Sequence, residues 1–335
     1  MRLAYVAAKD RLPSYASQFS RRDFTLPQLF ACLVVKEQLK LSYRKAELFL
    51  LDCPDWCAQI GLHRVPDHNT LCRAAKLLLS QQKVNHLLDL LAQWAAQAKL
   101  LRLSTHPLAL DSTTYESHHV SRHYEHRRRQ TRDRGQPKGR HRARSSQSAR
   151  RLPKLALGVA SGCHLVLSLW TGTGVGADHP HYRRVVREAR ERVPDRHFKV
   201  VADAGYDSEA AHAWTRGQMK LQSLIPPQLG RPRNDGGPPG GYWRARMKRQ
   251  LGSSDSRRRS GYTQRWQAET THSMMKRNLS SSLAGRTAWS RRRDMMLKAL
   301  VHNLMILRPR GSRQSTHKCF VLGLGGIRAT FRHIP

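Results

Sequence analysis

Two aspartates stand where a carboxylate could act on a bound ligand. Asp111 follows the short apolar run 108–110, and Asp203 follows the run 198–202. An α/β fold binds its ligands in the crevice at the carboxyl ends of its strands, and both side chains would project there. An aspartate that only closes a turn is also common at a strand end, so neither residue identifies a site by itself.

A third acid lies in a stretch with an informative spacing. Intervals of three, four and seven residues separate the polar side chains of Tyr262, Arg265, Glu269 and Lys276. These intervals add up to nearly whole helical turns, so all four side chains are expected on one face of a helix. A surface helix with an Arg265–Glu269 pair would explain the charges, but it would not require Tyr262 and Lys276 on the same line.

Three motifs in chain order carry a resemblance to a known family. They are Leu-Asp-Ser-Thr at 110–113, Asp-Ala-Gly-Tyr-Asp at 203–207, and Tyr-x2-Arg-x3-Glu-x6-Lys at 262–276. With these motifs the chain resembles the DDE transposases of bacterial insertion sequences, most closely the insertion-sequence-four and -five superfamily. The similarity covers about residues 25–308.

The resemblance implies a ribonuclease H-like catalytic domain, in which helices flank a mixed sheet. It makes Asp111, Asp203 and Glu269 the catalytic acids and the ligands of two divalent metal ions, Mg²⁺ or Mn²⁺. Carboxylates suit this task because hard cations prefer oxygen ligands. The implied activity is metal-dependent DNA strand cleavage and strand transfer.

The same resemblance implies contacts to DNA from the helix that carries Glu269. Arg265 and Lys276 would clamp phosphates beside the scissile bond, and Tyr262 would add a hydroxyl to the backbone contact. Trp266 is a candidate for base stacking. Because both transposon ends must be joined, we expect a homodimer in the complex with DNA.

The region 106–310 has the pattern of an α/β layer domain, in which short apolar strands alternate with helices. Two period-2 runs flank Ser161-Gly162 and predict an antiparallel hairpin. The expected elements are strands at 108–110, 154–160, 164–170 and 198–202, and helices near 180–192, 262–278 and 294–307. A Pro/Gly-rich connection spans 226–241.

The first part of the chain, 1–105, reads as a small all-α module with apolar residues at helical spacing. Pro27 is expected in the first turn of one helix, and the segment 67–69 is expected to cap another. A helix-turn-helix reader of DNA around 65–71 is one interpretation. A plain bundle for packing or dimerisation is equally compatible with the pattern.

The charge of the chain favours a polyanionic partner. Lys and Arg number 60 against 23 Asp and Glu, a formal net charge of +37. Such an excess is expected of a protein that binds double-stranded DNA, here transposon ends and target. The arm 121–154 is rich in Arg, and Arg127, Arg128 and Arg129 are candidate phosphate contacts. The tail 311–335 suggests no role.

Composition also indicates the cellular location of the protein and the state of its cysteines. The chain has no apolar run long enough for a membrane span and no signal-peptide pattern at its start, so we expect no membrane partner and a cytoplasmic, nucleoid-associated protein. The six cysteines are unevenly spaced and read as buried thiols. A zinc site is a weaker interpretation of Cys53, Cys57, His63, His68 and Cys72.

Other functional classes fit less well. The segment 172–177 matches the dinucleotide-binding pattern G-x-G-x-x-A. It follows a hairpin strand, however, and Asp203 at the end of the next strand is too distant for the acid of such a site. Asp178 and His179 are better interpreted as caps of the next helix. A metal site at His118, His119, His123 and His126 is less expected than a DNA-facing surface. The principal alternative is a catalytically decayed or regulatory DNA-binding protein. A host nuclease of ribonuclease H type would share the acids.

Overall fold

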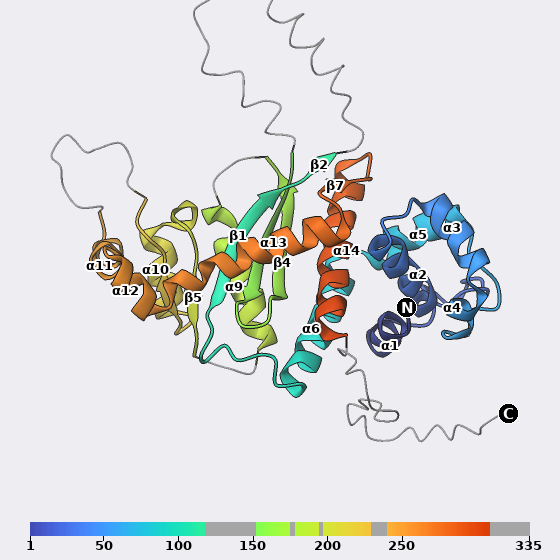
Figure 1. The fold of residues 1–335 in the computed structure, drawn as a ribbon, viewed down its shortest axis with the longest axis horizontal. Coiled ribbons are helices and arrows are strands. Elements are labelled where there is room, and N and C mark those ends of the chain that lie inside the picture. Colours follow the sequence, from blue (N-terminus) through green and yellow to red (C-terminus); the bar gives the residue numbers. More distant parts are fainter. Residues whose placement is uncertain (118–151, 175–177, 194–196, 229–239, 309–335) are drawn as a thin grey trace, which may run out of the picture.

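The computed structural model describes residues 1–117, 152–174, 178–193, 197–228 and 240–308, and a mixed five-stranded sheet lies at its centre (Figure 1). The strand order is β4-β3-β1-β5-β6. The first three strands in that order pair antiparallel, whereas β1, β5 and β6 run parallel. The strands are β1 (Leu108–Thr114), β2 (Glu116–Ser117), β3 (Pro153–Ala160), β4 (Leu165–Thr173), β5 (Lys199–Val201), β6 (Gln222–Leu224) and β7 (Ser282–Leu283).

Helices precede the sheet and cover both of its faces. A separate short pair, β2 with β7, runs parallel at one end. The helices and 3₁₀ turns are α1 (Arg2–Arg11), α2 (Leu26–Gln38), α3 (Tyr43–Asp52), α4 (Pro54–Ala58), α5 (His68–Leu78), α6 (Gln81–Gln97), α9 (His179–Arg192), η1 (Ala204–Tyr206), α10 (Glu209–Gly217), α11 (Tyr242–Gln250), α12 (Ser254–Ser260), η2 (Tyr262–Arg265), α13 (Trp266–Leu279) and α14 (Ala288–Leu307).

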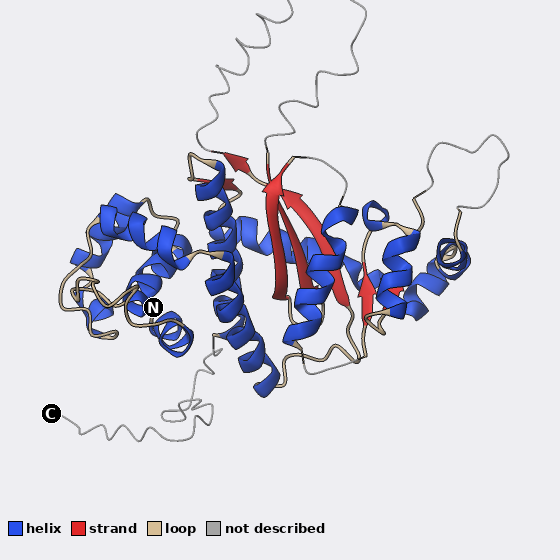
Figure 2. Ribbon diagram, turned by 180° about the vertical axis from the view of Figure 1, so that it is seen from behind, coloured by secondary structure: helices blue, strands red, loops and turns tan. Residues whose placement is uncertain are grey.

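Alternate residues of β1 face opposite layers of the protein. Ala109 belongs to the core shared with α13 and α14, whereas Leu108 and Leu110 belong to the core shared with α9 and α10. Figure 1 shows α13 crossing one face of the sheet, and Figure 2 shows α9 on the opposite face. Since side chains alternate along a strand, Asp111 shares the face of Ala109 and Ser112 shares that of Leu110.

The amino-terminal helices begin at the turn signals in the sequence. Thr25 forms a capping box with Gln28 at the start of α2, and the Asp67 carboxylate accepts from the backbone N–H groups of Asn69 and Thr70 at the start of α5. Each such cap satisfies backbone donors that the helix leaves without partners. Both of the predicted helix starts, at Pro27 and at 67–69, are therefore confirmed.

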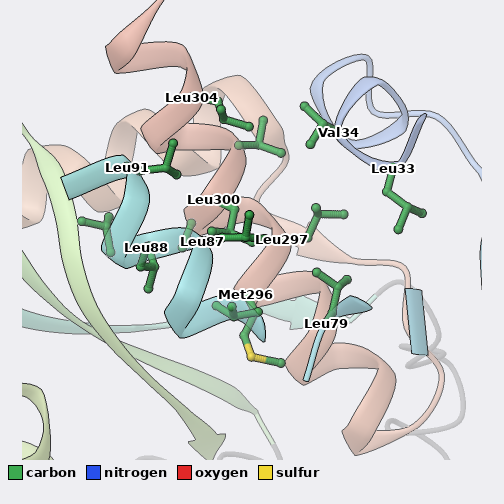
Figure 3. Close-up of a cluster of buried hydrophobic side chains, with 14 of the residues drawn as sticks. Leu33, Val34, Leu79, Leu87, Leu88, Leu91, Met296, Leu297, Leu300 and Leu304 are labelled. Carbon is green, nitrogen blue, oxygen red and sulfur yellow. The ribbon is translucent and has the colours of Figure 1, made fainter. Parts of the chain in front are cut away.

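Long apolar side chains join these helices to α14. Figure 3 shows Leu33 and Val34 of α2 and Leu87, Leu88 and Leu91 of α6 gathered around residues of α14, which are Met296, Leu297, Leu300 and Leu304. These side chains belong to a buried cluster that continues to the sheet. Apolar burial on this scale is the main stabilising contribution to the arrangement.

A buried charge triad connects α2 with α14 inside the same core. Lys298 Nζ lies 2.7 Å from Glu37 Oε1, and Lys36 Nζ lies 3.3 Å from Glu37 Oε2. All three side chains are almost fully buried. The Lys298 ammonium also donates to the Leu279 carbonyl oxygen, so α13 is tied to the same point. Buried ions of this kind require their partners, because a lone charge in the core is costly.

Several predicted boundaries differ from the observed ones. β1 does not end at Leu110 but continues to Thr114, because it pairs with β3 as far as Thr114 opposite Lys154. The segment 262–278 is not one helix: Tyr262–Arg265 forms a 3₁₀ turn, and α13 starts at Trp266. α14 starts at Ala288 rather than near residue 294, since Thr287 and Ser290 form a capping box there. The hairpin of β3 and β4 is confirmed.

Candidate active site

Asp111 lies where the central strand leaves the core. Leu108, Ala109 and Leu110 are fully buried, whereas Asp111 and the residues after it in β1 are partly exposed. Burial raises the pKa of Asp111 to about 7, and the charges of Asp203 and Glu269 add to this effect. A backbone hydrogen bond at Ser112 and the Arg265 charge act in the opposite direction. Asp111 is thus a carboxylate whose ionised form is disfavoured by its surroundings.

Asp203 reaches the same edge of the sheet from the neighbouring strand. β5 runs parallel to β1, with Val201 opposite Ala109, so the chain leaves both strands in the same direction. Asp203 then caps η1, and its Oδ1 accepts a hydrogen bond of 3.0 Å from the backbone N–H of Gly205. Burial raises the pKa of Asp203, and the nearby charges of Asp178 and Glu269 raise it further.

Glu269 approaches these aspartates from α13, which crosses the sheet (Figure 1). Its Oε1 lies 2.5 Å from Arg265 Nη1, so the carboxylate is held in an ion pair within its own segment. Its side chain is 51 % exposed, which leaves it able to change partner. In the parts of the chain that the structure describes, no three His, Cys, Asp or Glu side chains form a group that could hold a metal ion.

The basic and aromatic residues of the third motif lie around these acids. Lys276 Nζ donates to Thr113 Oγ1 at 2.7 Å and lies 5.4 Å from the ring centre of Tyr115, so it faces β1 two residues beyond Asp111. Tyr262 and Arg265 are in η2, and burial raises the pKa of the Tyr262 hydroxyl. Trp266 is 53 % exposed at the start of α13. The single helical face predicted for the motif is therefore divided between a 3₁₀ turn and a helix.

His272 connects α13 to β1, and the sequence motifs do not include it. It lies three residues after Glu269 and is buried, with Nε2 3.3 Å from the Asp111 carbonyl oxygen and 3.9 Å from Asp111 Oδ2. Burial lowers the pKa of His272 to about 4, so the ring is neutral at pH 7 and Nε2 can donate to the carbonyl oxygen. The only sequence signal is its three-residue offset from Glu269, and a histidine at that spacing is equally typical of a helix face that merely packs.

The interpretation of Asp178 as a helix cap is wrong. It occupies the N-cap position of α9, but its side chain makes no capping hydrogen bond. The carboxylate instead accepts from Ser112 Oγ at 2.7 Å and pairs with Lys154 Nζ at 2.5 Å. The sequence predicts a local cap because it does not show that β1 and β3 bring these two partners beside α9.

Several candidate residues lie outside the described part of the chain. These are residues 121–151 of the basic arm, with Arg127, Arg128 and Arg129, the four histidines at 118–126, and the tail from residue 309. Among the helices that are described, none combines the length and the apolar character needed to cross a bilayer. At the weaker zinc candidate, His68 is bonded to Glu47 and Cys57 is buried, and the described residues hold no metal-binding group.

Comparison with known proteins identifies a family for the region that contains the sheet and α13. The family model for the transposase DDE domain matches residues 104–304, which include the whole central sheet and α13. No match was found among curated proteins or solved structures. Because the matched segment covers more than half of the chain, we conclude that this protein belongs to the transposase DDE domain family.

Proposed function

We propose that this chain is a DNA transposase that binds the ends of its insertion sequence, cleaves the DNA there and joins the exposed ends to target DNA. The observation that carries the proposal is the convergence of Asp111, Asp203 and Glu269 at one edge of the sheet. They come from β1, the start of η1 and α13, and they are near enough for the charges of Asp203 and Glu269 to act on Asp111. This convergence supports a site on the insertion-sequence-four and -five pattern with a ribonuclease H-like fold.

The donor chemistry of these acids fits divalent cations. Asp111 and Asp203 have raised pKa values because both are partly buried near other negative charges, and a cation between them would stabilise their ionised forms. Asp111, Asp203 and Glu269 would hold two ions of Mg²⁺ or Mn²⁺. When bound, such ions stabilise the negative charge that develops on the phosphate during cleavage.

Arg265 and Glu269 would change partners when DNA binds. In the free protein they form an ion pair, and neither is fully buried. A DNA phosphate offers Arg265 a second partner with two acceptor oxygens, which matches the guanidinium fork. We infer that the phosphate forms an ion pair with Arg265, so that the Glu269 carboxylate can turn toward Asp111 and Asp203. This exchange accounts for an acid that lies beside the other two without joining them in the DNA-free chain.

The other proposed contacts to DNA come from side chains near the acids and on the surface of α5. Lys276 is held by Thr113 near the acids and would support a phosphate, Tyr262 would contribute its hydroxyl, and Trp266 offers an exposed ring for base stacking. α5 exposes Arg73 and Lys76 after its cap, which suits a DNA-facing helix in the amino-terminal module.

We divide the chain functionally into a helical DNA-binding or dimerisation module at 1–105, a catalytic domain at 106–310 with the basic arm 121–154, and a tail at 311–335 without a proposed role. Transfer of two ends requires two catalytic sites, so we propose a homodimer in the DNA complex. With DNA as its partner, we propose that the protein is associated with the nucleoid in the bacterial cytoplasm.

The test is cleavage of a plasmid that carries the DNA flanking the gene, with Mg²⁺ or Mn²⁺. The native chain is compared with Glu269→Gln, and with Glu191→Gln as a control, because Glu191 is exposed on α9 away from the acids. We expect metal-dependent nicks at the flank boundaries with the native chain and the control, and none with Glu269→Gln. Specific binding of the flanks without nicks would refute the proposal and favour the decayed or regulatory DNA-binding protein.

A further inference from the structure

Asp178 occupies a helix-capping position but uses its carboxylate elsewhere. An aspartate cap stabilises a helix by accepting from its first backbone N–H groups, and α9 does not receive this bond from Asp178. The Oδ1 atom is instead shared by the Ser112 hydroxyl and the Lys154 ammonium. Because Ser112 directly follows Asp111 in β1, this contact ties Asp178 to the strand that carries the first acid of the proposed site.

The second oxygen of Asp178 lies on the side of Asp203. A β-carbon built on Gly205 would be 3.4 Å from Asp178 Oδ2 and 3.1 Å from Asp203 Oδ1. Both carboxylates therefore flank the same glycine, although Asp178 precedes α9 and Asp203 precedes η1. The Asp178 side chain is only 18 % exposed, so water screens its charge incompletely.

A buried hydroxyl marks the same location. Tyr206 has no exposed surface, and its hydroxyl makes no hydrogen bond of ordinary geometry to a described residue, although it lies beside Ser112. The charges of Asp178, Asp111 and Asp203 all act on this hydroxyl, so it lies near all three carboxylates. Buried polar atoms usually have a partner, and one without it beside three carboxylates is typical of a place that a ligand completes.

Resting on the proposed function, we propose that Asp178 is a fourth acid of the active site, a positioning residue that strengthens divalent-cation binding by Asp111 and Asp203. It acts from the α9 face of the sheet, whereas Glu269 acts from the α13 face. Its charge adds to the negative potential beside Asp203, and its bond to Ser112 holds the strand next to Asp111. Lys154 partly neutralises Asp178 and so limits this effect.

The test measures Mn²⁺ binding to the full-length protein without DNA, by titration calorimetry. Asp178→Asn keeps the shape and an acceptor for Ser112 but removes the charge, and we expect it to weaken Mn²⁺ binding about tenfold or more, as loss of one charge near a partly buried cation requires. Lys154→Gln removes the neutralising ammonium, and we expect tighter binding. In the Asp178→Asn background the Lys154→Gln effect should shrink, because the carboxylate charge that Lys154 neutralises is then absent. Asp255→Asn, an exposed acid on α12, is the charge-matched control and should change affinity less than twofold.

Opposite effects of the two single variants would support the inference, because loss of structure would weaken binding in both. A native-like Mn²⁺ affinity of folded Asp178→Asn would overturn it. If Asp178→Asn does not fold, unchanged or weaker binding by Lys154→Gln would overturn it instead, and so would the absence of Mn²⁺ binding by the native chain. The proposed function fails separately: Mn²⁺ binding with these differences, but no cleavage of the flanking DNA, would refute the transposase activity alone.

Discussion

Gly205→Ala tests how closely the position of Asp203 controls cleavage. The new methyl group would lie 3.1 Å from Asp203 Oδ1, whereas ordinary contacts of this kind are 3.4–4 Å. The carboxylate must therefore move by a few tenths of an ångström, against the 3.0 Å hydrogen bond from the Gly205 N–H. A displacement of 1 Å in an active site costs roughly 100-fold in rate, so this smaller one should slow cleavage about three- to tenfold.

The assay for Gly205→Ala is the single-turnover rate of the first nick with excess protein, together with DNA affinity by gel shift. We expect a slower nick and unchanged DNA affinity, since the change is confined to the acid. Gly217→Ala is the matched control, because a β-carbon there meets no atom within 4 Å, and it should cleave at the native rate. A native nicking rate for Gly205→Ala would refute the reasoning that the Asp203 carboxylate must keep its present position.

Three further predictions concern stability and DNA binding. Burial lowers the pKa of His212 to about 4, below its unfolded value near 6.5, so the unfolded state binds the extra proton and the folding stability should fall as the pH drops from 6.5 to 4. Thermal unfolding of the native and His212→Gln proteins at pH 7 and pH 5 checks this, and an equal loss of stability in both proteins would contradict it. Glu37→Gln removes the carboxylate that pairs with two buried ammonium groups and should cost about 3–5 kcal/mol in urea unfolding, whereas Asp255→Asn at the surface should cost less than about 0.5 kcal/mol. Replacing Arg127–Arg129 by alanine should lower the salt dependence of DNA affinity by up to about three ion equivalents, and an unchanged slope would exclude the arm from phosphate contact.

The helix starts, the hairpin and the order of the candidate catalytic acids all follow from local sequence. The caps at Thr25 and Asp67 start their helices where the residue types predict, because a cap depends only on neighbours a few residues away. The hairpin of β3 and β4 is equally local, since Ser161 and Gly162 suit the turn and alternation suits the strands. The order and spacing of Asp111, Asp203 and Glu269 likewise point to the family to which the chain belongs.

The tertiary structure decided which other side chains meet these acids. β1 extends through Asp111 to Thr114 because a strand distant in sequence pairs with it, and no apolar run in 111–114 signals that extension. The same pairing sets Lys154 near Ser112, which draws Asp178 away from its helix cap. His272 meets Asp111 only because α13 crosses the sheet at that level.

The difference between what the sequence predicts and what only the tertiary structure shows has a physical cause. Helix caps, tight turns and the spacing of motif residues are determined by interactions within a few residues, so the sequence alone indicates where Asp111, Asp203 and Glu269 lie along the chain. Strand pairing and helix packing depend on the burial of apolar surface from distant segments, and many pairings satisfy one pattern of residues. The contacts of Asp178 and His272 depend on that packing, because their partners come from β1 and β3.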